Sequence, residues 1–251
     1  MLTRFGAYLL ALASLVTCPP PLSANDQTPQ RLNFVLIVAD ALGWSDLGCY
    51  GADLLETPSI DKLASAAMRF TDAYAASVCT PRRACLLTGR HYARLHMTVW
   101  REAALDPPHD RKLIPPVAVA DLPQNEQTLA EVFHSAGYRT ALVGKWHLSD
   151  AANYPETQGF DFNIGGTLWG APESYFFPYR GKGLWGQELR YIPHLEDGKP
   201  GEYLTDRLTD EALKLIDSAG DHPFFLYLAH HAPHIPVQPK PELVDHYDKK
   251  L

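Results

Sequence analysis

Three apolar runs along the chain have the length and composition of buried β-strands. The run 33–39 (NFVLIVA) is rich in β-branched residues and ends at Asp40, and the run 223–229 (PFFLYLA) ends just before His230. Residues 138–144 form a third such segment. Continuous apolar runs of this kind are typical of parallel strands that are buried on both faces. We therefore expect three strands here, with 33–39 in the centre of a sheet.

Segments between these runs carry helix signals instead. Thr57 followed by Pro58 predicts an N-cap and a first helical residue. Thr128 and Glu131 have the spacing of a capping box, and residues 203–219 place apolar side chains on one helical face. This strand–helix–strand rhythm predicts an α/β fold, with a mixed, mostly parallel central sheet flanked by helices.

The remaining segments are less regular. Residues 68–74 alternate well enough to predict a further strand. Residues 91–123 lack a period and contain several prolines, which predicts a long loop over an active site. Residues 169–185 are rich in aromatic residues and glycine. Their rings could stack on sugars or pack against one another inside the loop, and the sequence leaves both interpretations open.

Composition limits the classes of partner. The chain has 251 residues, of which 46% are hydrophobic and 20% charged, as in ordinary globular proteins. Its net charge of -7 comes without a basic stripe, so we expect no binding to nucleic acid. Any anionic ligand must therefore be held by a few local cations.

The N-terminus has the pattern of an export signal. Arg4 precedes an apolar run at 8–16, and residues 22–24 (LSA) form a plausible cleavage site. The run is too short to span a membrane permanently, so we expect an exported protein, periplasmic or secreted, without a stable membrane span. Cys18 as a lipid-bearing residue is the second interpretation. The predicted organisation is a signal peptide (1–24), a linker (25–32) and the N-terminal part of a catalytic domain (33–251).

One cysteine lies in a distinctive motif, Cys79-Thr80-Pro81-Arg82-Arg83. This motif is followed by Leu87-Thr88-Gly89-Arg90. Pro81 suits the first turn of a helix, and Cys79 would then lie just before the helix N-terminus, close to Arg83. Such a place lowers the pKa of a thiol and favours an anionic ligand. A buried structural cysteine is the alternative interpretation. Cys49 and Cys85 could form a disulfide or remain free.

Further polar groups follow the predicted strands. Asp40 ends the first one, and open α/β sheets bind ligands at the carboxyl ends of their strands. Lys145 and His147 are two residues apart after the second strand, so an extended segment would point both the same way. His234 follows the third strand. The neighbouring His230 and His231 would point apart on a strand, so we do not expect them to chelate a metal.

Taken together, these stretches resemble the type I, formylglycine-dependent sulfatases, an arylsulfatase-like group within the alkaline phosphatase superfamily. The Cys-x-Pro-x-Arg motif carries the resemblance, and the likeness extends from Asn33 to Leu251. It implies the sulfatase fold and a sulfuric ester hydrolase, with a sulfated small molecule or glycan as substrate. It also implies that a formylglycine-generating enzyme oxidises Cys79 to formylglycine, whose hydrate is the nucleophile.

The resemblance also assigns roles to individual side chains. It implies that Cys79, Arg83 and His147 are catalytic. It implies that Lys145 and His234 bind the substrate's sulfate. Asp40 and the modified Cys79 would bind Ca²⁺, with Mg²⁺ as the alternative ion.

Two departures from the family pattern qualify these expectations. Ala41 stands where the family normally has a second aspartate, and the loss of a carboxylate should weaken calcium binding. The chain matches only the N-terminal portion, so a second pair of metal ligands, a further lysine and a smaller C-terminal domain are expected beyond it. Three functions stay open: a sulfatase, a sulfatase-like protein without turnover, and a phosphate or phosphonate esterase.

Overall fold

The computed structural model describes residues 31–251. The chain divides into two units, Met1–Arg31 and Leu32–Leu251, and every element given below belongs to the second. The predicted signal peptide, Cys18 and almost all of the predicted linker lie outside the described residues.

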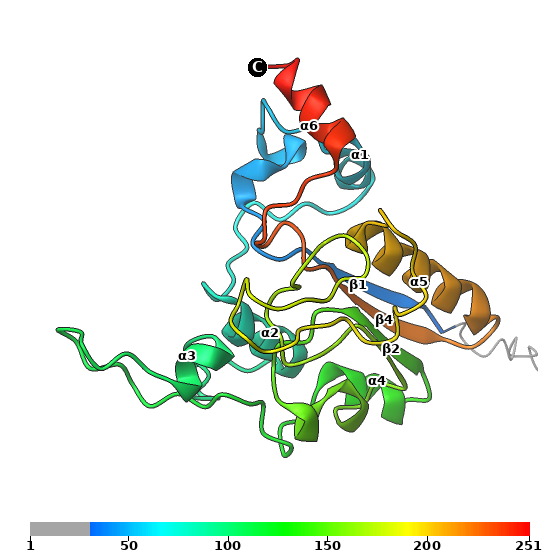
Figure 1. Cartoon of the computed structure of the whole chain (residues 1–251). Helices are drawn as coiled ribbons and strands as arrows, with labels where there is room; N and C mark the ends of the chain where they lie inside the picture. Colours follow the sequence, from blue (N-terminus) through cyan, green and yellow to red (C-terminus); the bar gives the residue numbers. More distant parts are fainter. Residues whose placement is uncertain (1–30) are drawn as a thin grey trace, which may run out of the picture. The chain divides into compact units, whose positions relative to one another are not determined.

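A parallel sheet forms the centre of the second unit (Figure 1). Its strands are β1 (Phe34–Val38), β2 (Arg139–Gly144), β3 (Phe162–Ile164) and β4 (Phe224–Ala229), in the spatial order β1-β4-β2-β3. All three strand pairs are parallel, which confirms the predicted α/β class. The three predicted strands are confirmed, and β3 is a short strand that the sequence pattern did not reveal.

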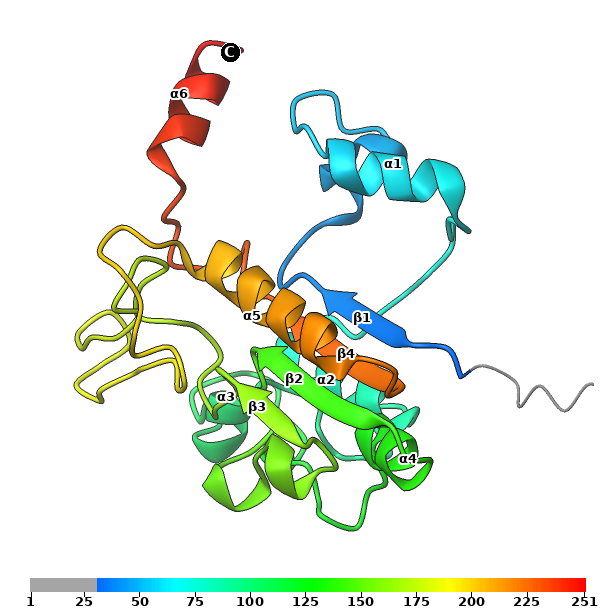
Figure 2. The ribbon, with the colours of Figure 1, turned by 90° about the vertical axis from the view of Figure 1, so that its right-hand side faces the viewer.

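Helices cover both faces of this sheet (Figure 2). Along β2, Leu142 packs into one core cluster, whereas Ala141 and Val143 pack into the other, because successive strand residues point to opposite faces. The first cluster includes α2 (Cys79–Thr88) and α4 (Leu129–Ser135), and the second includes α5 (Leu204–Ala219). Each fully buried leucine in these layers contributes about 1.5–3 kcal/mol.

The predicted capping box is confirmed at α4. The backbone N–H of Glu131 donates to Thr128 Oγ1 over 3.1 Å, and the N–H of Thr128 donates to Glu131 Oε2 over 2.7 Å. These two bonds satisfy N–H groups that the helix itself cannot pair. The predicted helix at 203–219 is confirmed as α5.

The expected burial of β1 on both faces is wrong for the part of the chain that the structure describes. Val35 and Ile37 are 47% and 61% exposed. Leu36 and Val38 pack against the first core cluster, whereas Val35 and Ile37 point to the opposite face and join neither cluster. Within residues 31–251, β1 pairs with β4 only and lies at the edge of the sheet. The strand β1 thus has the apolar sequence typical of a central strand, although it lies at the edge of the sheet.

A second correction concerns residues 68–74, where the structure has no strand. Met68 and Tyr74 are exposed, so the alternating pattern finds no neighbouring strand to pair with. The preceding helix α1 (Pro58–Ala66) begins as predicted with Thr57 as its N-cap residue, but the Thr57 side chain makes no capping hydrogen bond. Its hydroxyl instead donates to Asp61 Oδ1 over 3.0 Å.

Two helices were not predicted. The short α3 (Arg101–Leu105) lies inside the expected loop 91–123, and α6 (Pro241–Asp248) contacts the segment before α1, where His246 Nε2 lies 3.0 Å from Glu56 Oε2. None of the helices in residues 31–251 is long and apolar enough to cross a membrane.

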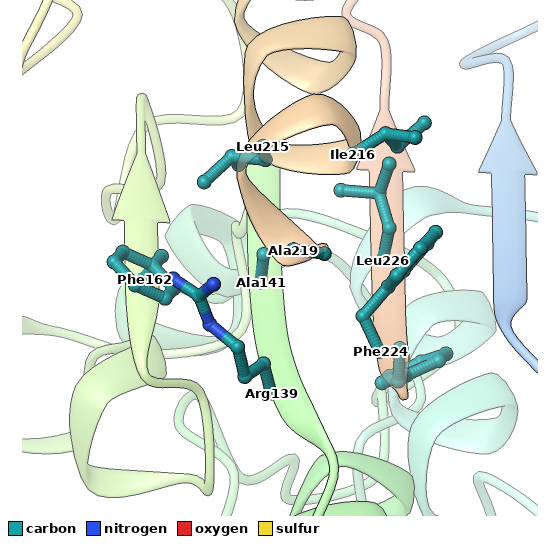
Figure 3. Close-up of a pocket in the computed structure, with 9 residues that line it drawn as sticks. Arg139, Ala141, Phe162, Leu215, Ile216, Ala219, Phe224 and Leu226 are labelled. Carbon is teal, nitrogen blue, oxygen red and sulfur yellow. The ribbon is translucent and has the colours of Figure 1, made fainter. Parts of the chain in front are cut away.

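A small apolar cavity lies between α5 and the sheet (Figure 3). Arg139 and Phe224 line it and are the first residues of β2 and β4, so the cavity lies at the amino ends of the strands. The side chains that carry chemistry follow the carboxyl ends. This cavity is therefore separate from the candidate site.

Candidate active site

The polar residues singled out in the sequence gather at the carboxyl edge of the sheet. Asp40 follows β1, Lys145 follows β2, and the histidine-rich segment 230–234 follows β4. Backbone hydrogen bonds hold these segments together, from Lys145 N to Ala229 O over 2.7 Å and from Asp40 N to Ala232 O over 3.0 Å. The parallel arrangement thus places groups that are far apart in sequence side by side.

Helix α2 brings Cys79 to the same edge. The helix begins at Cys79 itself, with Val78 as N-cap, so the expectation that the cysteine precedes the helix is wrong by one position. Cys79 still lies in the first turn, where backbone N–H groups have no partner within the helix. Thr80 Oγ1 donates to the carbonyl oxygen of His147 over 3.1 Å, which fixes the helix start against the end of β2.

The surroundings of Cys79 favour the thiolate. Burial alone would raise the pKa of this thiol, but the nearby His147 and the charge of Lys145 lower it to about 7. Cys49, Cys79 and Cys85 are all free thiols in the structure, so Cys49 and Cys85 do not form the disulfide that the sequence left open. Burial raises the pKa of Cys85, which makes Cys79 the more reactive thiol of helix α2.

A buried ionic cluster lies beside the thiol. Lys145 is fully buried and its Nζ donates to Asp40 Oδ2, while Arg83 Nη2 lies 3.8 Å from Asp40 Oδ1. Burial alone would raise the pKa of Asp40, but Lys145 and Arg83 hold it below its usual value. One carboxylate thus faces two buried cations. The excess positive charge suits an anionic ligand such as a sulfate group, because a buried unpaired charge is costly.

The orientation of Arg83 is fixed from two sides. Its Nη1 donates to the carbonyl oxygen of Lys145 over 2.8 Å and to the hydroxyl of Tyr227 over 3.2 Å. Arg83 is only 2% exposed, so its guanidinium has little freedom to move away. The arginine of the Cys-x-Pro-x-Arg motif is therefore a fixed cation at the site.

His147 is held by a carboxylate that the sequence did not reveal. Its Nε2 lies 3.0 Å from Oε2 of Glu102, which belongs to α3. Burial alone would raise the pKa of Glu102, but the hydrogen bond with His147 lowers it to about 2. Only a short helix in a segment without periodicity carries this residue, so no sequence signal pointed to Glu102.

The hydrogen bond from His147 to Glu102 selects the tautomer. Glu102 is ionised at neutral pH, so Nε2 carries the proton that it donates to the carboxylate. Nδ1 is buried and has no hydrogen-bond partner within the described residues. His147 also has a φ of 55°, an uncommon conformation for this residue type and one that is concentrated at functional sites.

Two histidines after β4 complete the site. His234 interacts electrostatically with Asp40 and Lys145, and burial lowers its pKa. His231 is 2% exposed, and both of its ring nitrogens lack a partner within residues 31–251. The structure thus brings all six predicted site residues to one edge of the sheet and adds His231 and Glu102.

We expected calcium at this site, but the oxygen donors of the described residues are too few to form a calcium site. Calcium takes about six to eight oxygen ligands. Within residues 31–251 no three side chains of His, Cys, Asp or Glu form a group that could hold a metal ion. Asp40 is already paired with Lys145, and Ala41, at the position of the missing aspartate, has an exposed side chain and a φ of 63°. Asp40 therefore remains a predicted ligand.

A prediction follows from Ala41. Ala41→Asp is expected to raise calcium affinity about tenfold or more, because it adds a carboxylate next to Asp40, and aspartate tolerates a positive φ better than alanine. Ala41→Asn is the matched control, since it fits the same backbone without adding charge. Calorimetric titration with calcium measures both variants, and equal affinities for them would contradict the prediction.

Fold and site together define an α/β protein with a fixed anion site built around a reactive cysteine. A family model described as Sulfatase matches residues 32–250. The chain belongs to the sulfatase family.

Individual relatives agree with this assignment. The chain is 36% identical to N-acetylgalactosamine-6-sulfatase of Homo sapiens over 83% of its own length and 41% of that protein. It is 33% identical to arylsulfatase G of Rattus norvegicus over 92% of this chain and 46% of the relative. The chain thus spans less than half the length of these curated relatives.

Solved structures give the same result. A crystal structure of Ps i-CgsB in complex with a neocarrahexaose superposes with a TM-score of 0.68 and 31% identity, covering 88% of this chain and 49% of that one. A second structure, described as bound to its substrate D-glucosamine-2-N,6-O-disulfate, has a TM-score of 0.63 and 25% identity. It covers 87% of this chain and 38% of its own.

Proposed function

We propose that the protein is a sulfuric ester hydrolase that cleaves sulfate esters of carbohydrates through a formylglycine made from Cys79. The observation that carries this proposal is the position of Cys79. It lies in the first turn of α2, next to His147 and to the buried cations Lys145 and Arg83. A nucleophile, a base and an excess of positive charge at one place are what sulfuryl transfer requires.

The proposed reaction proceeds in two steps. One hydroxyl of the hydrated formylglycine attacks the sulfur atom and the bond from sulfur to the ester oxygen breaks. The proton of the attacking hydroxyl passes to the departing alkoxide, so the product leaves as a neutral alcohol. The second hydroxyl then gives its proton to Nδ1 of His147, the carbon–oxygen bond to sulfate breaks, and the aldehyde re-forms. Lys145 and Arg83 stabilise negative charge on the sulfate oxygens, and His234 binds the sulfate or assists the leaving alcohol. A plain thiol has no second hydroxyl, so it would not complete this cycle.

Glu102 is proposed as a positioning residue. It does not reach Cys79, but its hydrogen bond to Nε2 orients the His147 ring and leaves Nδ1 free to accept the proton. Gly170 packs closely against the same ring, since a Cβ at that position would lie only 2.4 Å from His147 Cε1. A base that is held in place needs no rearrangement before proton transfer.

The relatives support a carbohydrate substrate. Their names and titles mention N-acetylgalactosamine-6-sulfatase activity, a neocarrahexaose complex and a disulfated glucosamine substrate. We propose the same class, a sulfated small molecule or glycan, for this chain. We also propose export to the periplasm or exterior and maturation by a formylglycine-generating enzyme.

Calcium, or magnesium, stays a prediction of the family resemblance. The described residues supply one carboxylate toward such an ion, and no step above depends on it. This observation favours a second candidate function, which is binding of sulfated glycans without turnover. Calorimetric titration with calcium separates the two, because micromolar or tighter binding would exclude the inactive alternative.

Turnover of two aryl esters tests the reaction class. We expect the mature protein to hydrolyse 4-nitrophenyl sulfate faster than 4-nitrophenyl phosphate. A clear preference for the phosphate ester would exclude the sulfatase proposal and favour the phosphate or phosphonate esterase.

The unmodified protein offers a test of the site that does not require turnover. Alkylation of Cys79 by iodoacetamide is expected to rise with pH around a midpoint near pH 7, since the pKa of this thiol is lowered to about 7 and the thiolate predominates above it. His147→Ala removes a side chain that lowers the pKa of this thiol, and it should move the midpoint upward. Peptide mass analysis assigns the alkylated residue. A wild-type midpoint near the ordinary thiol value of about 8.5 would contradict the proposed environment.

Replacement of Glu102 tests its positioning role. Glu102→Gln is expected to lower kcat on the order of 10²-fold with little change in KM, because it disturbs the His147 tautomer and leaves sulfate binding intact. Glu102→Asp should restore part of the loss, and Glu242→Gln on the exposed surface of α6 is the control. An unchanged kcat for Glu102→Gln would show that the carboxylate does not act through His147.

A further inference from the structure

We propose that Arg190, with Trp169 and Trp185, forms a subsite for a second acidic group of the substrate, a carboxylate or another sulfate. This inference rests on the proposed function, since it extends the same site toward the rest of the glycan. The sequence suggested two uses for the aromatic segment 169–185, ring stacking on sugars or packing within the loop. The structure instead places two of its rings against a guanidinium.

The side chain of Arg190 is enclosed but has no acceptor. Its Cζ lies 4.9 Å from the ring centroid of Trp169 and 5.1 Å from that of Trp185, and the residue is 9% exposed. Nε is buried without a hydrogen-bond partner, and no carboxylate within residues 31–251 lies within 4.0 Å of the guanidinium. A guanidinium has five N–H donors, so a buried one without an acceptor calls for a ligand.

The loop that carries Arg190 is held in place. Its backbone exchanges two hydrogen bonds with Gly181, each 3.1 Å long, and the indole Nε1 of Trp185 donates to the carbonyl oxygen of Pro172 over 3.1 Å. The guanidinium is therefore positioned before any ligand arrives, which reduces the entropy lost on binding.

Arg190 lies on the side of the candidate site where Glu102 holds His147. Trp169 is followed by Gly170, whose backbone packs against the His147 ring. Glu102, which holds that ring, also interacts electrostatically with Arg190. In this proposal a sugar whose sulfate lies at Cys79 extends past His147, and its second acidic group reaches Arg190.

Three carboxylates lie near Arg190, but none of them forms an ion pair with its guanidinium. Glu102, Glu173 and Glu188 all act on Arg190 from beyond ion-pair distance. Glu102 is engaged by His147, and Glu173 Oε1 accepts from the N–H of Leu184 over 2.8 Å. No carboxylate of these three residues therefore accepts a hydrogen bond from the guanidinium. A planar or tetrahedral oxyanion matches the fork of an arginine, whereas a neutral hydroxyl would use only one donor.

The test compares ligands that differ in their second group. Calorimetry would measure binding of N-acetylgalactosamine 6-sulfate alone, of a disaccharide that adds a uronic acid, and of a disaccharide that adds a second sulfated sugar. We expect at least one disaccharide to bind about tenfold or more tightly than the monosaccharide. Arg190→Gln should abolish that preference and leave the affinity for the monosaccharide unchanged.

Two further variants keep the result interpretable. Arg190→Lys retains the charge but not the fork, so it should keep part of the preference and guards against misfolding of the glutamine variant. Arg180→Gln is the control, because Arg180 is an exposed arginine of the same loop. Equal affinities of the wild-type protein for all three ligands, no binding of any, or an equal loss for all of them in Arg190→Gln would overturn the subsite. A retained preference without turnover would count against the proposed reaction alone.

Discussion

Replacement of Asp40 by alanine is expected to lower the free energy of unfolding by about 3–5 kcal/mol, the typical cost of removing one partner from a buried ion pair. Asp40 is 2% exposed, and the fully buried Lys145 would lose the carboxylate that accepts its hydrogen bond. Lys145 and Arg83 would then face each other without a compensating charge. Denaturant unfolding of the Asp40→Ala protein measures the change.

Matched variants separate charge from shape. Asp40→Asn keeps the volume but not the charge, and it should lose most of the same stability. Asp53→Ala removes an exposed carboxylate elsewhere and should change stability by less than about 0.5 kcal/mol. A loss below about 1 kcal/mol for Asp40→Ala would contradict the account of the ionic cluster.

The same cluster predicts a pH dependence. The pKa of Asp40 in the folded protein is lowered from its ordinary value of 3.8, so its contribution to stability is complete above that value. The contribution is lost as the pH falls below 3.8 toward the folded-state pKa. The stability difference between wild type and Asp40→Asn should therefore shrink in strong acid.

Replacement of Cys79 by alanine is expected to lower sulfate-ester hydrolysis by about 10⁶-fold, the order of loss seen when an enzyme's nucleophile is removed. No neighbouring side chain can take over, because only a formylglycine hydrate supplies both the attacking and the expelling hydroxyl. Initial rates with 4-nitrophenyl sulfate measure the effect.

A second cysteine on the same helix provides the control. Cys85 is a free thiol of α2 that lies outside the site, so Cys85→Ala should retain turnover. Activity of Cys79→Ala within tenfold of the wild type would show that the reaction does not proceed through residue 79.

The elements that the sequence predicted well are those with a strong local pattern. The apolar runs at β1, β2 and β4 and the capping box of α4 specify strands and a helix through nearest neighbours alone. The strand predicted at 68–74 is absent, because a strand forms only where a neighbouring strand can pair with its backbone. The prediction that β1 is buried on both faces was wrong because Val35 and Ile37 pack into neither core cluster of the described residues.

The site residues that could be predicted are likewise those that follow a regular element. Asp40, Lys145 and His234 follow strands, so the parallel sheet was enough to predict that they meet. Glu102 and Arg190 lie in irregular segments whose paths depend on tertiary packing. Their roles follow from what they contact, His147 in one case and two indole rings in the other, and contacts of that kind leave no periodic signal in a sequence.

The most direct test of the central claim is peptide mass analysis of the protein isolated from its native source, with sulfatase activity assayed on the same sample. A peptide that carries formylglycine at position 79, in protein that hydrolyses sulfate esters, is the predicted result. Sulfate-ester hydrolysis by protein in which Cys79 is entirely an unmodified thiol would contradict the proposed mechanism.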